Sequence, residues 1–248
     1  MEKYGLIGKT LVHSFSKNFF SEKFRTEQID ARYDLFELPD ITDFTQLAQT
    51  ENLFGLNVTI PYKESVMSFL DDLDDNAKEI GAVNTIQFNK IDGETILKGF
   101  NTDAIGFESS LKPLLKPHHS RALILGTGGA SKAILHVLKK LGMETQLVSR
   151  QRKAGIISYD DLDKEIIDDF KLIVNCTPAG TFPNTNEMPP FPTEYLSRQH
   201  LVYDLIYNPE TTLLCHKAKE MGATTKNGLE MLHGQAIAAW NIWQKRKK

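Results

Sequence analysis

The sequence predicts an α/β protein of two domains. Short apolar runs typical of buried strands alternate with amphipathic segments typical of helices along the chain. A length of 248 residues suits two modest domains or one large one, and a change of pattern near Asn101 favours two. We expect a small α/β domain before that point and a doubly wound parallel sheet after it.

Composition and charge are those of an ordinary globular protein. The chain is 41% hydrophobic and 25% charged, and its net charge of −3 gives no reason to expect nucleic acid as a partner. No apolar stretch approaches membrane-spanning length, the first residues do not resemble a signal peptide, and two cysteines are too few for a disulfide framework. We therefore expect a cytoplasmic protein that does not bind membranes.

The first part of the chain is expected to alternate strands and helices. Strands are expected at residues 4–8, 33–38 and 56–59, and a hairpin at 82–88 and 96–100. One helix is expected after the polar loop 10–16, with Ile29 as its last apolar position, another at 43–50, and a third starting at Pro61. Residues 71–75 read as a solvated connection without the features of a calcium loop, so we expect no metal site.

The second part continues the alternation. A helix is expected at 103–115, and strands at 122–125, 146–149, 172–176, 201–205 and 223–226. Further helices are expected after residue 131, at 211–221 and at 228–244, and Gly142 closes the first of them. Strands alternating with helices predict a parallel, doubly wound sheet.

A glycine-rich turn links the strand 122–125 to the helix that follows it. Gly126 permits the turn, Gly128 lets the backbone approach a pyrophosphate, and the helix N-terminus offers free N–H groups to an anion. Ser131 stands where the third glycine of the usual fingerprint would be. A purely conformational turn is the alternative, but the flanking strand and helix favour a Rossmann-type dinucleotide site.

The residues after the next strand indicate which dinucleotide. No acidic residue, which would hold the ribose of NAD, occurs between Glu144 and Asp160. The segment 149–153 is instead Ser-Arg-Gln-Arg-Lys, and a guanidinium suits the 2′-phosphate of NADP. Ordinary surface charge is the alternative. Position favours Arg150 as a phosphate ligand and leaves Arg152 and Lys153 undecided.

Seven short stretches elsewhere carry a family resemblance. They are residues 13–16, 55–63, 81–85, 101–103, 175–180, 203–209 and 228–235. Together, and in this order, they resemble the shikimate dehydrogenase family. The match runs over nearly the whole chain, and seven motifs in register are highly specific.

The resemblance implies a substrate domain of residues 1–102, completed by the helix 228–248, and an NADP domain of residues 103–227. It implies reversible NADPH-dependent reduction of 3-dehydroshikimate to shikimate, on the pathway to chorismate and the aromatic amino acids. Lys63 and Asp103 resemble the catalytic pair. The residues that resemble substrate ligands are Ser14, Ser16, Thr59, Asn84, Tyr207 and Gln235. Those that resemble cofactor ligands are Gly126, Gly128, Gly129, Ala130, Ser149 and Arg150.

The chemistry of Lys63 and Asp103 fits that implication. Lys63 is expected in the first turn of a helix, whose positive end disfavours an ammonium, and Asp103 at a helix start that favours a carboxylate. Our hypothesis is that Lys63 exchanges a proton with the substrate oxygen while Asp103 orients it. A solvated lysine and an N-cap aspartate are the alternatives for each residue alone.

The expected substrate ligands have structural alternatives too. Ser14 and Ser16 alternate along an expected extended loop, so both hydroxyls would face one side and, with Tyr207, bind a carboxylate. The alternative for either serine is to cap the next helix. Asn84 is expected as a buried amide that needs partners, and Gln235 lies either near the buried face of its helix or exposed.

The chain departs from the family pattern at a few positions. Lys17 and Thr10 stand where the family usually or often has proline, and the usual helix after Arg150 is missing. A relaxed quinate/shikimate dehydrogenase using NAD and a nucleotide-binding regulator without turnover are the competing functions. The expected partner is a small-molecule substrate, and the expected state is a monomer or homodimer.

Overall fold

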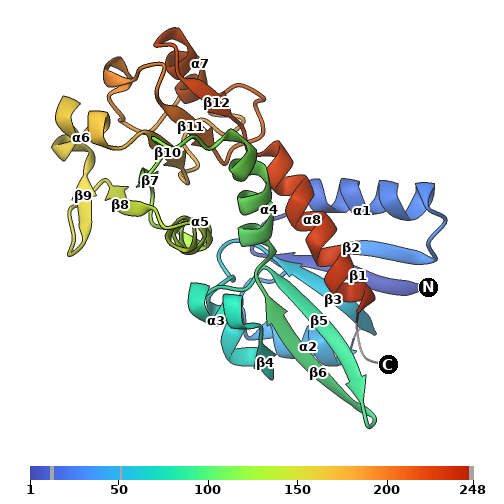
Figure 1. Cartoon of the computed structure of the whole chain (residues 1–248). Coiled ribbons are helices and arrows are strands. Elements are labelled where there is room, and N and C mark those ends of the chain that lie inside the picture. The colour runs from blue at the N-terminus through green and yellow to red at the C-terminus, as the bar shows by residue number, and fades with distance from the viewer. Residues whose placement is uncertain (12–13, 51, 246–248) are drawn as a thin grey trace. The chain divides into compact units, whose positions relative to one another are not determined.

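The structure is a computed structural model that describes residues 1–11, 14–50 and 52–245. It divides into two compact units, and each is built on its own six-stranded sheet (Figure 1). Unit 1 comprises Met1–Thr102 and Gln235–Lys248, and unit 2 comprises Asp103–Gly234. The chain thus leaves unit 1 after Thr102 and returns to it at Gln235, inside the last helix rather than at its start.

Unit 1 contains a mixed sheet with the strand order β2-β1-β3-β5-β6-β4. Strands β2, β1 and β3 are parallel, β5 is antiparallel to both β3 and β6, and β4 is parallel to β6. The strand bounds are Glu2–Gly8, Ala31–Glu37, Leu53–Val58, Asp72–Leu73, Thr85–Ile91 and Glu94–Phe100 for β1 to β6. The hairpin turns at Asp92 and Gly93, which both have positive φ, as a two-residue turn requires.

Helices cover both faces of this sheet. One face packs against α1 (Phe15–Thr26) and the C-terminal part of α8 (Leu229–Gln244), through a cluster that includes Tyr4, Phe20 and Trp243. The other face packs against α2 (Asp43–Thr50), the 3-10 helix η1 (Ser65–Phe69) and α3 (Asp75–Ile80). Tyr4 and Ile7 of β1 contribute to opposite faces, as residues an odd number apart along a strand do.

Two local expectations in unit 1 are wrong. No helix starts at Pro61: residues 60–64 form turns, and helix formation begins with η1 at Ser65. Helix α1 ends at Thr26, so Ile29 lies beyond it, although its side chain still packs against the α1 cluster. The acidic run 71–75 is mostly exposed, as expected, and the structure adds that Asp71 accepts a bond from Leu97 N and that Asp74 caps α3.

Unit 2 contains an all-parallel sheet of the Rossmann type, with the order β12-β11-β10-β7-β8-β9. All its strand pairs run parallel. The strand bounds are Arg121–Leu125, Glu144–Ser149, Ile156–Ser158, Leu172–Asn175, Leu201–Asp204 and Thr224–Lys226 for β7 to β12. The doubly wound α/β fold predicted from the alternation of strands and helices is therefore confirmed.

The helices of unit 2 follow the expected pattern with a few additions. They are α4 (Thr102–Leu111), α5 (Gly129–Lys140), α6 (Lys164–Asp169), α7 (Leu213–Glu220) and the start of α8, with short 3-10 helices at Lys112–Leu114, Tyr159–Asp161 and Thr193–Tyr195. Helix α4 ends four residues before the expected limit, and α6 was not expected. Between β8 and β9 the described chain forms turns and no helix.

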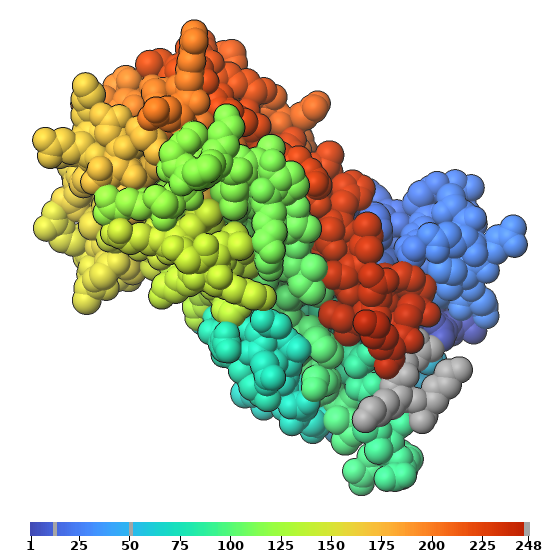
Figure 2. Space-filling view, viewed as in Figure 1, coloured from blue at the N-terminus to red at the C-terminus, as the bar shows by residue number. Residues whose placement is uncertain are grey.

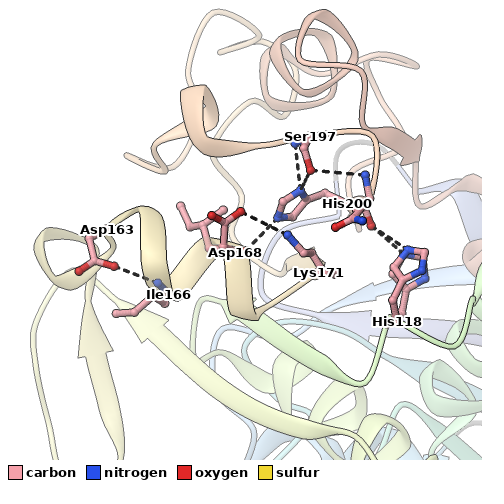
Figure 3. A network of polar contacts seen from close by, with 10 residues as sticks. His118, Asp163, Ile166, Asp168, Lys171, Ser197 and His200 are labelled. Atoms are coloured by element: carbon pink, nitrogen blue, oxygen red, sulfur yellow. Dashed lines mark hydrogen bonds and ion pairs between the residues drawn. The ribbon is translucent and has the colours of Figure 1, made fainter.

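Two buried histidines, His119 and His200, bond to loop backbone in unit 2, and Figure 3 shows His200 beside Ser197. His200 Nδ1 accepts from Ser197 N at 2.9 Å, and its Nε2 lies 2.9 Å from Ile167 O. His119 Nδ1 accepts from Lys116 N at 3.1 Å, and its Nε2 lies 3.1 Å from Gln199 O. Because each ring accepts at one nitrogen and donates at the other, both histidines are held neutral.

Candidate functional site

The glycine turn of unit 2 has the geometry of an anion site. Gly128 is the N-cap of α5, and a Cβ at this position would meet no atom within 4 Å, so the space beside the backbone is open. Gly129 and Ala130 form the first turn of α5, whose N–H groups have no partner within the helix. The residues predicted to hold a pyrophosphate therefore stand at an accessible helix N-terminus.

Gly126 and Ser131 explain how this turn is built. Gly126 has φ +102°, a conformation that requires glycine, and a Cβ there would also lie tightly, 3.1 Å from Thr177 Cγ2. Ser131 is buried and its hydroxyl donates to Gly128 O at 2.6 Å. The serine that replaces the third glycine thus stabilises the turn with a buried side-chain hydrogen bond.

The basic segment after β8 is exposed at the edge of unit 2 and lies in yellow-green to yellow in Figure 2. Arg150 is exposed, and its charge opposes the effect of burial, which raises the pKa of Tyr159 to about 12. Ser149 uses its hydroxyl locally, donating to Gln151 O at 2.5 Å. Ser149 and Arg150 are the two predicted cofactor ligands in this segment. Within the described part of the chain, only Arg150 of the two has an exposed side chain that is not used in a hydrogen bond to a neighbouring residue.

Arg152 is held by a neighbour. Its guanidinium forms an ion pair with Asp161, and Asp161 also accepts from Ser158 N at 2.8 Å. The pKa of Asp161 is lowered by the Arg152 bond first and by the Ser158 backbone bond second. Arg152 is therefore engaged in closing the turn before η3 (Tyr159–Asp161), which distinguishes it from Arg150.

In unit 1, Asn84 lies just before β5 and its amide orientation is fixed. Its Oδ1 accepts from Thr102 N at 2.7 Å, from Thr102 Oγ1 at 3.1 Å and from Thr85 Oγ1 at 3.1 Å. Because a backbone N–H only donates, the atom facing Thr102 N must be the amide oxygen. The Nδ2 group remains, and it has no acceptor within the described ranges. Asn84 is thus placed to donate hydrogen bonds to a ligand.

Gln235 joins the same cluster from the other end of the chain. It is 6% exposed, and its Oε1 lies 3.4 Å from Thr102 Oγ1. Of the two positions open for this glutamine, the structure shows the buried one. Thr102 is therefore the residue through which Asn84 and Gln235, far apart in sequence, come together.

The buried hydrogen bonds continue from Asn84 towards α1. Asn57 Nδ2 donates to Thr85 Oγ1 at 3.2 Å, and Tyr33 Oη donates to Asn57 Oδ1 at 2.8 Å. Ser16 is bonded to Tyr33, whose pKa is raised well above its usual range by burial, with the Ser16 bond opposing. A single chain of polar contacts thus joins Ser16 to Asn84 and Gln235, three of the predicted substrate ligands.

Ser14 and Ser16 do not share an extended loop, which corrects that expectation. Ser14 is the N-cap of α1 and accepts from Lys17 N at 3.2 Å, whereas Ser16 lies inside the first turn of the helix and is buried. The capping alternative is therefore the one realised at Ser14. His13, which precedes them in the motif, lies outside the described residues.

Lys63 also departs from its expected local structure. It lies in a turn, half-buried, and its carbonyl accepts from Val83 N at 2.7 Å. The argument from a helix N-terminus therefore does not apply to this lysine. Thr59 is half-buried at the end of β3, and its backbone N donates to Ile7 O at 2.9 Å.

Asp103 and Tyr207 belong to unit 2. Asp103 is buried in the first turn of α4, as expected, where the helix dipole favours a carboxylate. Tyr207 is 37% exposed and follows β11. Asp204, the last residue of that strand, is fully buried and accepts from Ile206 N at 3.1 Å.

Four residues of the buried polar chain were missed as site residues: Tyr33, Asn57, Thr85 and Thr102. A signal existed for three of them, since polar side chains inside the apolar stretches 56–58, 82–86 and 100–102 must find partners when buried. Tyr33 carries no such signal. No cluster of metal-ligating side chains occurs within residues 1–11, 14–50 and 52–245, and none of the helices there is long and apolar enough to cross a membrane.

Comparison with known proteins decides the family. The family model described as "Shikimate dehydrogenase substrate binding domain" matches residues 6–86. The NADP(+) shikimate dehydrogenase of Methanosphaera stadtmanae is 36% identical over 258 aligned residues, covering 96% of this chain and 90% of that protein. The chain belongs to the shikimate dehydrogenase family.

Other members of the shikimate dehydrogenase family agree with this assignment. The NADP(+) shikimate dehydrogenase of a Clostridium botulinum strain is 37% identical, covering 96% of this chain and 95% of that protein. The crystal structure of the Thermus thermophilus enzyme in complex with NADP(H) and shikimate is 28% identical, with a TM-score of 0.84, and covers 98% of this chain and 93% of that one.

Proposed function

We propose that this chain catalyses the reversible, NADP-linked oxidation of shikimate to 3-dehydroshikimate. The observation that carries the proposal is the fixed arrangement of Asn84, Thr102 and Gln235 in a chain of this family. Hydrogen bonds inside a buried cluster restrict its side chains to one geometry. Such preorganised amides suit a small ligand rich in hydroxyl groups.

Unit 2 is the proposed NADP domain, and unit 1, residues 1–102 completed by the end of α8, the proposed substrate domain. The turn from Gly126 to Ala130 fits a pyrophosphate, because open space and helix N–H groups lie side by side there. Arg150 would hold the 2′-phosphate, since a guanidinium forms paired bonds with phosphate. NADP, when bound, supplies the hydride acceptor.

Lys63 and Asp103 are the proposed catalytic pair. Oxidation of a secondary alcohol requires a group that takes the hydroxyl proton as hydride leaves the carbon. We assign that role to Lys63 and assign Asp103 to orienting the lysine and balancing its charge. The support is the match of both residues to the family motifs and the position of Asp103 at the start of α4.

The remaining assignments concern substrate binding. Asn84 would donate from Nδ2 to a substrate oxygen, because its Oδ1 is already engaged. Ser14, Ser16, Thr59, Gln235 and Tyr207 complete the proposed ligand set. Of the two serines, Ser16 is the one fixed by the buried chain through Tyr33.

The proposal is tested by following NADPH absorbance with shikimate and NADP, in parallel with NAD and with quinate. Lys63→Ala should lower kcat at least about a hundredfold, the low end for removing a general acid–base. Lys90→Ala is the matched control, because Lys90 is an exposed hairpin residue outside the proposed site. Its kcat should equal that of the unmodified protein.

Near-normal turnover by Lys63→Ala would refute the catalytic role. A chain that binds NADPH but turns over neither shikimate nor quinate would instead be a nucleotide-binding regulator. Faster turnover with NAD than with NADP would refute the assignment of Arg150.

A further inference from the structure

Asp204 is a buried carboxylate with no role in the function proposed above. It is the last residue of β11 and has no exposed surface. Its Oδ1 accepts from Ile206 N at 3.1 Å and from Asn175 Nδ2 at 3.0 Å, and its Oδ2 accepts from Thr212 Oγ1 at 2.6 Å. Both carboxylate oxygens are therefore engaged, and by three different segments of unit 2.

Two of these bonds enclose the segment that carries Tyr207. Ile206 directly precedes the tyrosine, and Thr212 lies where helix α7 begins. The segment is also bonded to its surroundings by its backbone, since Asn208 O accepts from Phe182 N at 3.1 Å. Asp204 thus fixes both ends of the loop from which the exposed Tyr207 side chain projects.

The third bond links this loop to the glycine turn. Asn175 ends β10 and pairs in register with Asp204. While its Nδ2 donates to Asp204, its Oδ1 accepts from Thr177 N at 3.0 Å and from Thr177 Oγ1 at 2.8 Å. Thr177 is the residue packed against Gly126. One carboxylate therefore connects the Tyr207 loop to the turn proposed for the cofactor.

Burying the Asp204 carboxylate has a free-energy cost that a nonpolar side chain at the same position would not have. Burial disfavours an ionised carboxylate and raises the pKa of Asp204, while the bonds from Thr212, Ile206 and Asn175 oppose that rise. Loops at the carboxyl ends of parallel strands are where α/β proteins of this type bind their ligands. A buried, fully bonded carboxylate at this edge gives the two loops one fixed geometry.

We propose that Asp204 is a positioning residue, which sets Tyr207 for binding the substrate by holding residues 206–212 to the end of β11. The inference rests on the proposed function, because it takes Tyr207 as a substrate ligand. Asp204 acts through the loop and does not touch the substrate.

The test is a double-mutant cycle with Asp204→Asn and Tyr207→Phe. Asparagine keeps the Oδ1 acceptor for Ile206 and Asn175 but presents an NH₂ group to Thr212, which already accepts from Cys215 N at 3.3 Å. We expect the KM for shikimate to rise about tenfold, as for the loss of a hydrogen bond to a charged group, with the KM for NADP unchanged. In the Tyr207→Phe background the same substitution should change KM little.

Asp71→Asn is the matched control, because Asp71 also accepts from a backbone N–H but lies in unit 1; its KM values should not change. Equal effects of Asp204→Asn with and without Tyr207→Phe, or an unchanged KM in the folded variant, would overturn the inference. If Asp204→Asn does not fold, Thr212→Val, which removes the bond to Asp204 Oδ2 and the capping bond from Cys215 N, enters the same cycle.

Hydrogen exchange separates this inference from the proposed function. The amides of residues 205–212 should exchange faster in Asp204→Asn than in the unmodified protein, whatever the substrate is. An unmodified protein without shikimate turnover would overturn the proposed function. Unchanged exchange in this segment would overturn the positioning role.

Discussion

Individual residues of the candidate site are defined by their hydrogen-bond partners more than by their type. Ser14 and Ser16 are the same residue two positions apart, yet one caps a helix and the other joins a buried polar chain. Asn84 acquires a donor role because three bonds occupy its oxygen. A polar group buried without a partner is unfavourable, so each bond restricts the orientation of the next residue.

The two arginines after β8 give a prediction at this scale. Arg150→Ala should raise the KM for NADP about 10- to 100-fold and leave the KM for NAD nearly unchanged, because a charged hydrogen bond to the 2′-phosphate is lost. Arg152→Ala should stay within about threefold, since Arg152 is exposed and paired with Asp161. Initial rates at varied NADP and NAD concentrations give these KM values for both variants. Equal losses for both variants would show that the ion pair opens to bind the phosphate.

At the scale of elements, glycine positions decide how closely helices approach the sheets. Gly55 of β3 faces Trp243 of α8, and a Cβ at Gly55 would lie 2.2 Å from the indole Nε1. The same indole donates to Ile86 O at 3.0 Å, so it cannot move away without losing that bond. The strand therefore needs glycine for the C-terminal helix to pack against unit 1.

Gly55→Ala should lower the free energy of unfolding by about 1–3 kcal/mol, the usual effect of overpacking a core. Denaturant titration followed by tryptophan fluorescence measures it. In the Trp243→Leu background the alanine should cost much less, because the clashing ring is gone and neighbouring substitutions are not additive. Additive losses would mean that the strand, and not the indole, resists the new methyl group.

At the scale of the whole molecule, stability should depend on pH through His119 and His200. Burial lowers the pKa of both rings, with their backbone bonds to Gln199 and Ile167 opposing. The unfolded chain then takes up protons near pH 6.5 while the folded chain does not. The stabilisation is therefore present above about pH 6.5 and is lost as the pH falls below it.

The melting temperature should accordingly be lower at pH 5.5 than at pH 7.5, and the drop should be smaller in His200→Gln. His216→Gln serves as control, because His216 is exposed on α7. Carboxylates with lowered pKa, such as Asp161, titrate at more acidic pH and do not contribute in this window. A drop of the same size in His200→Gln would exclude this histidine as its source.

The sequence by itself determined the features that depend on neighbours along the chain. The strand–turn–helix around Gly126, the alternation that gives the parallel sheet, the presence of a hairpin and the family resemblance all rest on short-range patterns, and the structure and comparisons confirm them. Predictions from local sequence patterns were wrong or incomplete at two places. Pro61 suits a helix start but lies in a turn, and the exposed acidic run 71–75 also caps α3 and accepts a bond from Leu97 N.

Only the tertiary structure decided which distant residues share one set of hydrogen bonds. Tyr33, Asn57 and Thr85 come from three strands, and Thr102 meets Gln235 across 133 positions of sequence. The bonds of Asp204 likewise join two strand ends and the start of a helix. These partners are chosen by the packing of sheets and helices, because a buried polar group bonds to whatever the fold brings within reach. The spacing of these residues along the chain therefore does not predict which of them become partners.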